Sequence, residues 1–271
     1  MLELICPLCQ EPLQHRSSQW ICTHNHSYDQ ARQGYLNLLL VQHKKSRQPG
    51  DTPEMLACRQ AFLDAGHYQP VSARIGELLA SAAAWKVLDM GCGEGYYTAR
   101  LQHALPDAAI GGMDISKDAI IKASRRSRDI QWLVGSTARL PVADASLDAA
   151  LSVFSPWSWE ECTRCLRPGG QMLLVGPHAD HLLALREKLY DSIHPTPELI
   201  KALPAGMEIV SDQTLRYALD LEPVDLTNLI GMTPHGFRSS PQRQREVIET
   251  GLTGLEVAMR MVLLQRSQGD S

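Results

Sequence analysis

Apolar runs alternate with amphipathic stretches through the middle of the chain. The runs have the length of buried strands, and they are WKVLDMG (85–91), AIGGMDI (109–115), IQWLVGS (130–136), LDAALSVF (147–154) and QMLLVGP (171–177). Stretches with helical spacing, such as DAIIKASRR (118–126), separate them. Strands that alternate with helices form a parallel sheet, and right-handed crossovers place helices on both of its faces. The pattern therefore predicts a doubly wound α/β fold.

Further elements flank this central pattern. Helical spacing predicts one helix over residues 54–65 and a second within VSARIGELLASAAA (71–84). Near the carboxyl terminus, residues 255–263 alternate between two faces, as in a half-buried strand. We expect this strand to pair antiparallel with TLRYALDL (214–221).

Four residues near the amino terminus have the spacing of a metal site. Cys6 and Cys9 form a CPLC knuckle, and Cys22 and His26 follow twelve residues later. Two such pairs close a tetrahedron around zinc, and a closed Cys3His site is structural because it has no vacant position. His24 is a rival to His26, although it lies too near Cys22 for comfortable closure. Free thiols or disulfides are the alternative to zinc.

The remaining cysteines do not form a disulfide framework. Seven cysteines are an odd number, and Cys58, Cys92, Cys162 and Cys165 are scattered through apolar segments. Cys162 and Cys165 form a second CxxC pair, but it has no partner pair nearby and is predicted to be helical. We interpret these four as small packing residues. The amino terminus lacks the features of a signal peptide, and no apolar run is long enough to span a membrane, so we expect a cytoplasmic protein.

Length and charge divide the 271 residues into two units and a connector. Residues 1–36 hold too few apolar side chains to fold without metal and are predicted to form a zinc ribbon. Residues 37–70 are a basic connector and a helix, and residues 71–271 form the α/β domain. The net charge is −4. The first 50 residues contain five basic and three acidic side chains, so a basic module with a net charge of +2 precedes an acidic domain.

A glycine-rich loop follows the first strand of the central pattern. The loop has the form DxGxGxG, made by Asp89, Gly91, Gly93 and Gly95, and a predicted helix begins directly after it. Glycines let the backbone approach a ligand closely. The next strand ends about twenty residues later in Asp114, whose carboxylate can bind ribose hydroxyls.

This loop and two later strings resemble the class I methyltransferases, which are Rossmann-like α/β enzymes dependent on S-adenosylmethionine. GSTARLPVADASLDAALS (135–152) resembles the third and fourth strands of that fold with their connector, and CLRPGGQMLLVGP (165–177) resembles the turn that leads into the fifth. One residue departs from the pattern: many members have an aspartate where this chain has Ser136.

The chain as a whole resembles the bacterial 23S ribosomal RNA guanine-N1-methyltransferases, which join a Cys3His zinc module to a class I domain. The likeness is carried by the metal ligands and by GYLNLLLVQHKKSRQPGD (34–51), RQAFLDAGHYQP (59–70), DMGCGEGYYT (89–98) and MTPHGFR (232–238). It implies methyl transfer from S-adenosylmethionine to N1 of a specific guanine in an rRNA hairpin.

The resemblance also implies roles for individual residues. Gly93, Glu94, Tyr68 and His181 would line the cofactor site, together with the loop residues and Asp114 named above. Lys44, Lys45 and Arg47 would grip 23S ribosomal RNA with the zinc module. The expected cofactors are S-adenosylmethionine and Zn²⁺. Which guanine is modified and whether the protein is a monomer or a homodimer are not set by the sequence.

The residue that removes the N1 proton is not identified by the sequence. Ser155, Trp157 and Trp159 follow the fourth strand and can hold or stack a base, but they are poor general bases. The main alternative function is methylation of a small molecule, with the zinc ribbon serving only as a folding clip. A third hypothesis, a nucleic-acid-binding module without activity, is disfavoured by the intact glycine loop.

Overall fold

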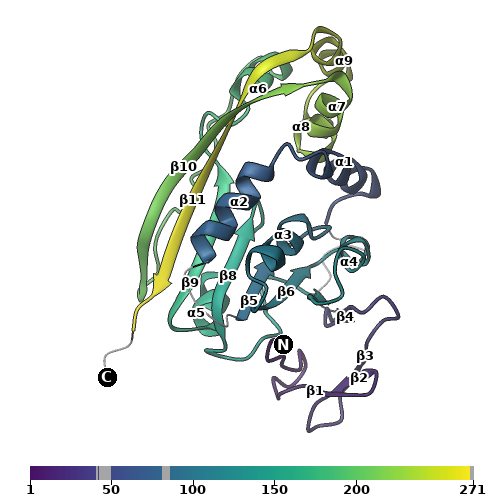
Figure 1. Cartoon of the computed structure of the whole chain (residues 1–271), viewed down its shortest axis with the longest axis vertical. Helices are drawn as coiled ribbons and strands as arrows, with labels where there is room; N and C mark the ends of the chain where they lie inside the picture. The colour runs from purple at the N-terminus through teal and green to yellow at the C-terminus, as the bar shows by residue number, and fades with distance from the viewer. Residues whose placement is uncertain (41, 43–49, 81–85, 269–271) are drawn as a thin grey trace.

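The protein contains a small antiparallel sheet and a large mixed sheet (Figure 1). A computed structural model describes residues 1–40, 42, 50–80 and 86–268. Within these ranges the large sheet has eight strands, and its order is β10 (Met207–Leu221), β11 (Leu252–Arg266), β9 (Leu166–Pro177), β8 (Leu147–Val153), β5 (Lys86–Met90), β6 (Ala109–Asp114), β7 (Gln131–Val134) and β4 (Leu36–Asn37).

The order of the strands in the sheet reverses direction beside β5. From β5 the sheet continues through β6 and β7 on one side and through β8 and β9 on the other, and neighbouring strands in this part are parallel. The switch point lies between β5 and β8, and the crevice beyond the carboxyl ends of such strands is where doubly wound folds bind ligands. The predicted α/β fold is confirmed.

Helices cover both faces of the sheet. They are α1 (Pro53–Asp64), α2 (Gln69–Leu79), α3 (Tyr96–Ala104), α4 (Lys117–Ala123), α5 (Trp159–Cys165), α6 (Leu183–Leu189), α7 (Pro223–Met232), α8 (His235–Arg238) and α9 (Pro241–Thr250). Several of them begin at an N-cap residue whose hydroxyl accepts a backbone hydrogen bond from the first turn. The Thr52 hydroxyl, for example, accepts a hydrogen bond from the Met55 N–H. Helices α1 to α4 pack in the apolar cluster on one face, and α5 packs in the cluster on the other.

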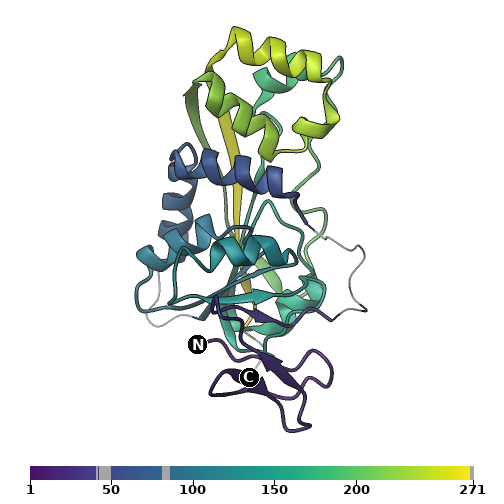
Figure 2. The same ribbon diagram turned by 90° about the vertical axis from the view of Figure 1, so that its right-hand side faces the viewer.

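Strands β10 and β11 are long and extend beyond the rest of the sheet (Figures 1 and 2). They pair antiparallel from Met207 opposite Arg266 to Leu221 opposite Leu252, which confirms the pairing expected from the alternating pattern. Helices α7, α8 and α9 lie between them in sequence, and we call these three helices the cap. Because α7 packs against α1, the cap reaches back over the carboxyl ends of the parallel strands.

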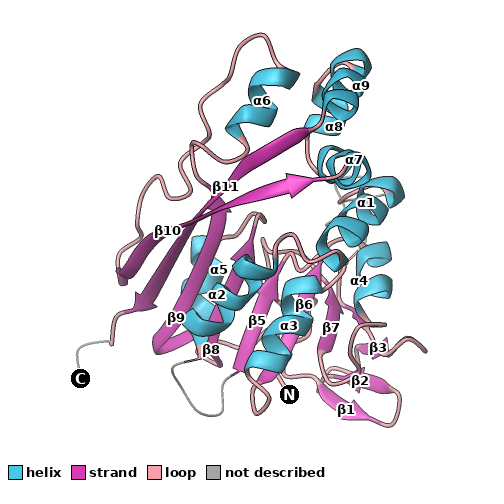
Figure 3. Cartoon of the chain, turned by 45° about the horizontal axis from the view of Figure 1, so that its top comes forward, coloured by secondary structure: helices cyan, strands magenta, loops and turns pink. Residues whose placement is uncertain are grey.

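The amino-terminal ribbon is attached to the large sheet rather than separate from it. Its three antiparallel strands are β1 (Gln14–Arg16), β2 (Gln19–Ile21) and β3 (Ser27–Asp29). Leu4 and Trp20 are buried in the same apolar cluster as Val142, and the Ile5 N–H donates to the Pro141 carbonyl at 3.1 Å. Strand β4, which the sequence did not indicate, then pairs parallel with β7 and forms the edge of the large sheet. Strand β7 lies on the side of that sheet that faces the ribbon strands β1 to β3 (Figure 3).

The helices in the described ranges lack the combination of length and apolarity that crossing a membrane requires.

Candidate functional site

The ribbon brings together Cys6, Cys9, Cys22 and His26. Their donor atoms all lie within 4.8 Å of one another. The Cys9 and Cys22 sulfurs are 3.6 Å apart, and His26 Nδ1 is 3.5 Å from the sulfurs of Cys6 and Cys22. Ligands about 2.3 Å from a tetrahedral zinc are separated by about 3.7 Å, so these four atoms fit that ion. His24 does not belong to the cluster.

Hydrogen bonds to the Cys6 thiol lower its pKa and so favour the thiolate form. The Tyr28 hydroxyl lies 3.1 Å from the Cys6 sulfur. Burial opposes ionisation, yet hydrogen bonds from Tyr28 and from the backbone N–H groups of Leu8 and Cys9 lower the pKa of Cys6 to about 6. Because thiolates are the form that binds zinc, this environment favours a metal centre.

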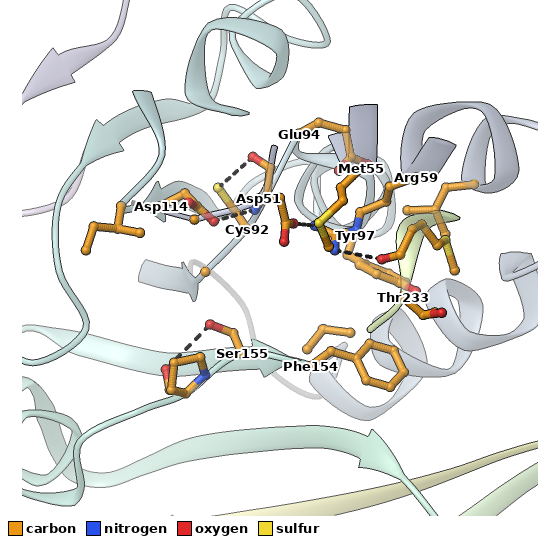
Figure 4. Close-up of a pocket in the computed structure, with 18 of the residues that line it drawn as sticks. Asp51, Met55, Arg59, Cys92, Glu94, Tyr97, Asp114, Phe154, Ser155 and Thr233 are labelled. Atoms are coloured by element: carbon orange, nitrogen blue, oxygen red, sulfur yellow. Dashed lines mark hydrogen bonds and ion pairs between the residues drawn. The ribbon is translucent and has the colours of Figure 1, made fainter. Parts of the chain in front are cut away.

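A second site lies beyond the carboxyl ends of β5, β6, β7 and β8. It is a cavity of about 560 Å³, a usual size for a small-molecule or cofactor site (Figure 4). The loops after these four strands form its floor, and residues of α1, α7 and α8 complete its walls. Six of the predicted cofactor residues line it: Tyr68, Gly91, Gly93, Glu94, Asp114 and His181.

The glycine loop is held in place by the carboxylate of Asp114. One Asp114 oxygen accepts the Gly93 N–H at 2.9 Å, and the other accepts the Ser116 N–H at 2.8 Å. Gly91 has a φ of 74°, in the left-handed region that favours glycine. Burial raises the pKa of Asp114, while its two backbone hydrogen bonds oppose this shift. The loop therefore presents backbone to the cavity beside one acidic side chain.

Asp89 and Gly95 lie outside the lining of the cavity. The Thr98 hydroxyl donates to Asp89 Oδ2 at 2.6 Å, which ties the end of β5 to α3. Burial raises the pKa of Asp89 to about 7. Gly95 is the residue before α3 and has a φ of 82°. Both residues set the path of the loop from beneath the cavity, so their expected part in cofactor binding stays a prediction.

His181 presents one defined nitrogen to the cavity. The Ala258 N–H donates to His181 Nδ1 at 3.3 Å, so the proton of the neutral ring is on Nε2, which lies 3.5 Å from the Tyr68 hydroxyl. Burial, with smaller contributions from the charges of His235 and Arg186, lowers the pKa of His181 to about 3. A neutral imidazole with an N–H donor is therefore the form at neutral pH.

Several lining residues were not assigned a role from the sequence. Arg59 forms an ion pair with Asp51, and its other nitrogen donates to the Met232 carbonyl at 3.3 Å, which fixes the segment that enters α8 (Figure 4). Phe154 and Phe237 also line the cavity. The available signals were the strings around 59–70 and 232–238, which carry the family likeness without indicating individual roles.

The residues after β8 separate into two groups. Ser155 lines the cavity, as does Ser136 after β7. Trp157 and Trp159 do not; their rings meet edge to face at 5.8 Å and pack against the apolar cluster on the other face of the sheet. Lys44, Lys45 and Arg47, the predicted RNA-binding residues, lie outside the described residues.

Known proteins resemble both parts of the chain. A family profile described as RlmA, N-terminal, a zinc ribbon, matches residues 4–47, and one described as Methyltransferase domain matches residues 87–170. A 23S rRNA (guanine(748)-N(1))-methyltransferase from Streptomyces fradiae is 34% identical over 88% of this chain and 87% of the relative. YxjB of Bacillus subtilis strain 168, to which 23S rRNA (guanine-N(1)-)-methyltransferase activity is assigned provisionally, is 34% identical over 88% of each chain.

Among solved structures, a chain of the complex between the Haloferax volcanii Trm112 methyltransferase activator and a methyltransferase has a TM-score of 0.51 at 20% identity, covering 79% of this chain and 95% of that one. This likeness concerns the fold alone. Fold, loop and metal cluster together define a class I S-adenosylmethionine-dependent methyltransferase with an amino-terminal zinc ribbon. By its similarity to relatives over nearly their whole length, the chain belongs to the 23S rRNA (guanine-N1)-methyltransferase family.

Proposed function

We propose that this protein transfers the methyl group of S-adenosylmethionine to N1 of one guanine in a hairpin of 23S ribosomal RNA. The observation that carries the proposal is the extent of the similarity: 34% identity to a named enzyme of this activity spans 88% of the chain, and the RlmA zinc-ribbon profile separately matches residues 4–47. A methyltransferase domain alone would leave the acceptor open, because many chemistries use this fold.

The cavity has the donors and acceptors that the cofactor requires. We assign binding of the ribose hydroxyls to the Asp114 carboxylate, and the close backbone contact with the cofactor to Gly91 and Gly93. The Gly93 N–H donates to Asp114, so these residues lie side by side in the loops after β5 and β6. His181 Nε2–H, with Tyr68 beside it, is assigned to the cofactor carboxylate. Glu94 lines the same cavity; its Oε1 lies 3.7 Å from an Arg126 nitrogen but has no hydrogen-bond partner among the described residues, so it can accept from a ligand.

The protein's own contribution to the reaction is placement and exclusion of water. S-adenosylmethionine supplies an already electrophilic methyl group on its sulfonium sulfur. The chain must therefore hold guanine N1 in line with that group, and binding in the cavity provides this orientation. Guanine N1 carries a proton at neutral pH, and this proton must leave as the new bond forms. His181 is not the base, because its Nδ1 is occupied by the Ala258 N–H.

Recognition of the RNA is assigned to the amino-terminal part. N1 lies on the Watson–Crick edge, so the target guanine must be unpaired or extruded, as in a hairpin loop. We assign the grip on the RNA backbone to the zinc ribbon of residues 1–36 and to the basic residues of the 37–70 connector. Chemistry is assigned to residues 71–271, with Tyr68 of the connector completing the cofactor site. This grip should weaken as salt rises.

The substrate also bears on location and assembly. Ribosomal RNA is in the cytoplasm, and none of the seven cysteines is in a disulfide, which supports a cytoplasmic protein. The protein can act as a monomer or as a homodimer, and light scattering of the purified protein distinguishes the two.

Primer extension tests the proposed activity. 23S ribosomal RNA from a strain that lacks this protein is incubated with purified protein and S-adenosylmethionine and then copied by reverse transcriptase. Methylation at N1 blocks base pairing, so we expect a new stop beside one guanine. The absence of a stop on both naked RNA and ribosomal subunits, with cofactor binding intact by calorimetry, would favour methylation of a small molecule instead.

A further inference from the structure

The three phenylalanines of the chain occupy contrasting environments. Phe62 is fully buried in the core. Phe154 and Phe237 are 46% and 65% exposed, and both line the cavity of the proposed cofactor site. An exposed aromatic ring lacks the stabilisation that burial in the core would provide. Two exposed rings at the rim of one cavity therefore indicate a ligand with a flat apolar face.

Phe154 is held in an unusual backbone conformation. Its φ is 53°, a region that bulky residues rarely occupy, and its N–H donates to the Val175 carbonyl at 2.9 Å. The next residue, Ser155, is packed against Gly91 of the glycine loop. Strained conformations that persist between two rigid elements are concentrated at ligand sites. The conformation therefore keeps the Phe154 ring at the cavity instead of in the core.

Phe237 comes to the same cavity from the cap. It lies in α8, four residues after Thr233, which also lines the cavity. The Arg238 guanidinium lies over the Phe237 ring at 5.7 Å from its centroid. Among the described residues Arg238 has no acidic partner within ion-pair distance. A stacking ring beside an unpaired cation suits a nucleotide, whose base stacks and whose phosphate attracts the cation.

The position of Phe154 separates it from the part of the cavity assigned to adenosine. Strands β6 and β8 lie on opposite sides of β5, so Asp114 after β6 and Phe154 after β8 are at different ends of the site (Figure 4). The Phe154 ring is instead close to the His181 ring, with centroids 6.2 Å apart. His181 is the residue assigned to the cofactor carboxylate, so Phe154 lies at the methionine half, from which the methyl group leaves.

We propose that Phe154 and Phe237 form the acceptor subsite, in which the two rings stack on the extruded guanine, one from the sheet and one from the cap. This inference deepens the proposed function and rests on it. Stacking places the plane of the base at the methyl donor while its edge stays free for reaction. The two rings thus act as positioning residues that fix the acceptor, whereas the glycine loop fixes the donor.

Leucine and tyrosine substitutions test the subsite. In Phe154→Leu and Phe237→Leu the apolar volume is largely kept and the aromatic face is lost, so kcat/KM for a hairpin RNA should fall by roughly 5-fold to 150-fold in each. Phe154→Tyr and Phe237→Tyr retain the face and should restore most of the activity. Val224→Ala, at an exposed apolar position of the cap outside the cavity, is the matched control and should behave as wild type.

Calorimetry with S-adenosylmethionine gives the second readout. Cofactor affinity should be unchanged in both leucine variants, because the rings contact the acceptor. A leucine variant that binds the cofactor much more weakly would assign its ring to the cofactor and overturn the proposal, as would leucine variants with wild-type activity. A wild-type protein that leaves RNA unmethylated rejects the proposed function as well, whereas an active wild type with equally active leucine variants rejects this subsite alone.

Discussion

Ser155 is packed so closely on Gly91 that a β-carbon added to Gly91 would lie 1.8 Å from the Ser155 hydroxyl oxygen. The two residues follow neighbouring strands, β5 and β8, at the switch point of the sheet. Their contact closes the floor of the cavity between the cofactor loop and the residues proposed to hold the acceptor. Glycine is required at position 91 both for its φ of 74° and for this approach.

Gly91→Ala should therefore destabilise the protein by more than backbone strain alone. The left-handed conformation costs about 1–2 kcal/mol, and the collision with Ser155 should add about 1–3 kcal/mol of overpacking. Gly206→Ala is the matched control, because Gly206 has a φ of 80° and a β-carbon added there would meet no atom within 4 Å. Urea unfolding of both variants measures the difference. Equal losses in the two would show that the Ser155 contact is easily relieved.

Cys9→Ala should release zinc and unfold the ribbon. We expect the bound zinc, measured by elemental analysis, to fall from about one equivalent to none, since three ligands do not close the tetrahedral site. RNA methylation should be abolished, while S-adenosylmethionine binding persists because the cavity-lining residues that the structure describes all lie from Gly50 onward.

Cys165→Ala provides the control for the zinc prediction. Cys165 belongs to the other CxxC pair, is buried in α5, and donates from its sulfur to the Val142 carbonyl at 3.6 Å. Its loss should leave the zinc content unchanged. A zinc-loaded and fully active Cys9→Ala protein would refute the structural role assigned to the metal.

Asp89→Asn should flatten the pH dependence of stability. Burial raises the pKa of Asp89 from 3.8 to about 7, so between these pH values the folded state keeps a proton that the unfolded state releases. Stability from this group is therefore greatest at low pH and falls as the pH rises toward 7. Asparagine keeps an acceptor for Thr98 and does not titrate. Urea unfolding from pH 4 to 8 measures both profiles, and parallel profiles would contradict the prediction.

His181→Asn should weaken cofactor binding by a factor that does not depend on pH. A lost hydrogen bond to a carboxylate corresponds to about 1.5–3 kcal/mol. Because the pKa of His181 is lowered to about 3, the ring is neutral in the folded protein throughout the range from pH 6 to 9. Calorimetry across this range compares the two proteins. An affinity ratio that changes near pH 6.5 would show that the ring titrates in the site.

The same lowered pKa has a consequence for stability. The unfolded chain protonates His181 below its ordinary value of 6.5, whereas the folded chain does so only near 3. The stability associated with the neutral ring is thus complete above 6.5 and is lost as the pH falls from 6.5 toward 3.

Features that are local in sequence could be predicted, and features set by distant packing could not. The DxGxGxG loop, Asp114 and the four metal ligands are short-range patterns with a direct physical meaning. The structure brings Gly91, Gly93 and Asp114 to one cavity and the four metal ligands to one cluster. The parallel strands were evident as apolar runs because both of their faces are buried. The acceptor side of the cavity gave no comparable short-range pattern, since Phe154 and Phe237 are far apart in sequence and come to the same cavity only through the return of the cap.

Two differences have specific causes. Trp157 and Trp159 follow the same strand as Ser155, but the chain turns into α5 there and carries both rings to the opposite face of the sheet. Strand β4 is only two residues long and lies within an apolar stretch, so it lacks the alternation or length that would identify it. Its pairing with β7 depends on the position of the ribbon, which is a tertiary property.

Strand β4 connects the zinc ribbon to the large sheet of the enzyme. Leu36 and Asn37 continue directly from the ribbon and hydrogen-bond along Leu133 and Val134, next to the strand that ends in Asp114. The ribbon is thus not a tethered appendage that can be exchanged for another module at will. A chimera in which a foreign RNA-binding domain replaces the ribbon would therefore need its own edge strand. Without one, the backbone hydrogen-bonding groups along β7 would be exposed to solvent and could pair with another chain.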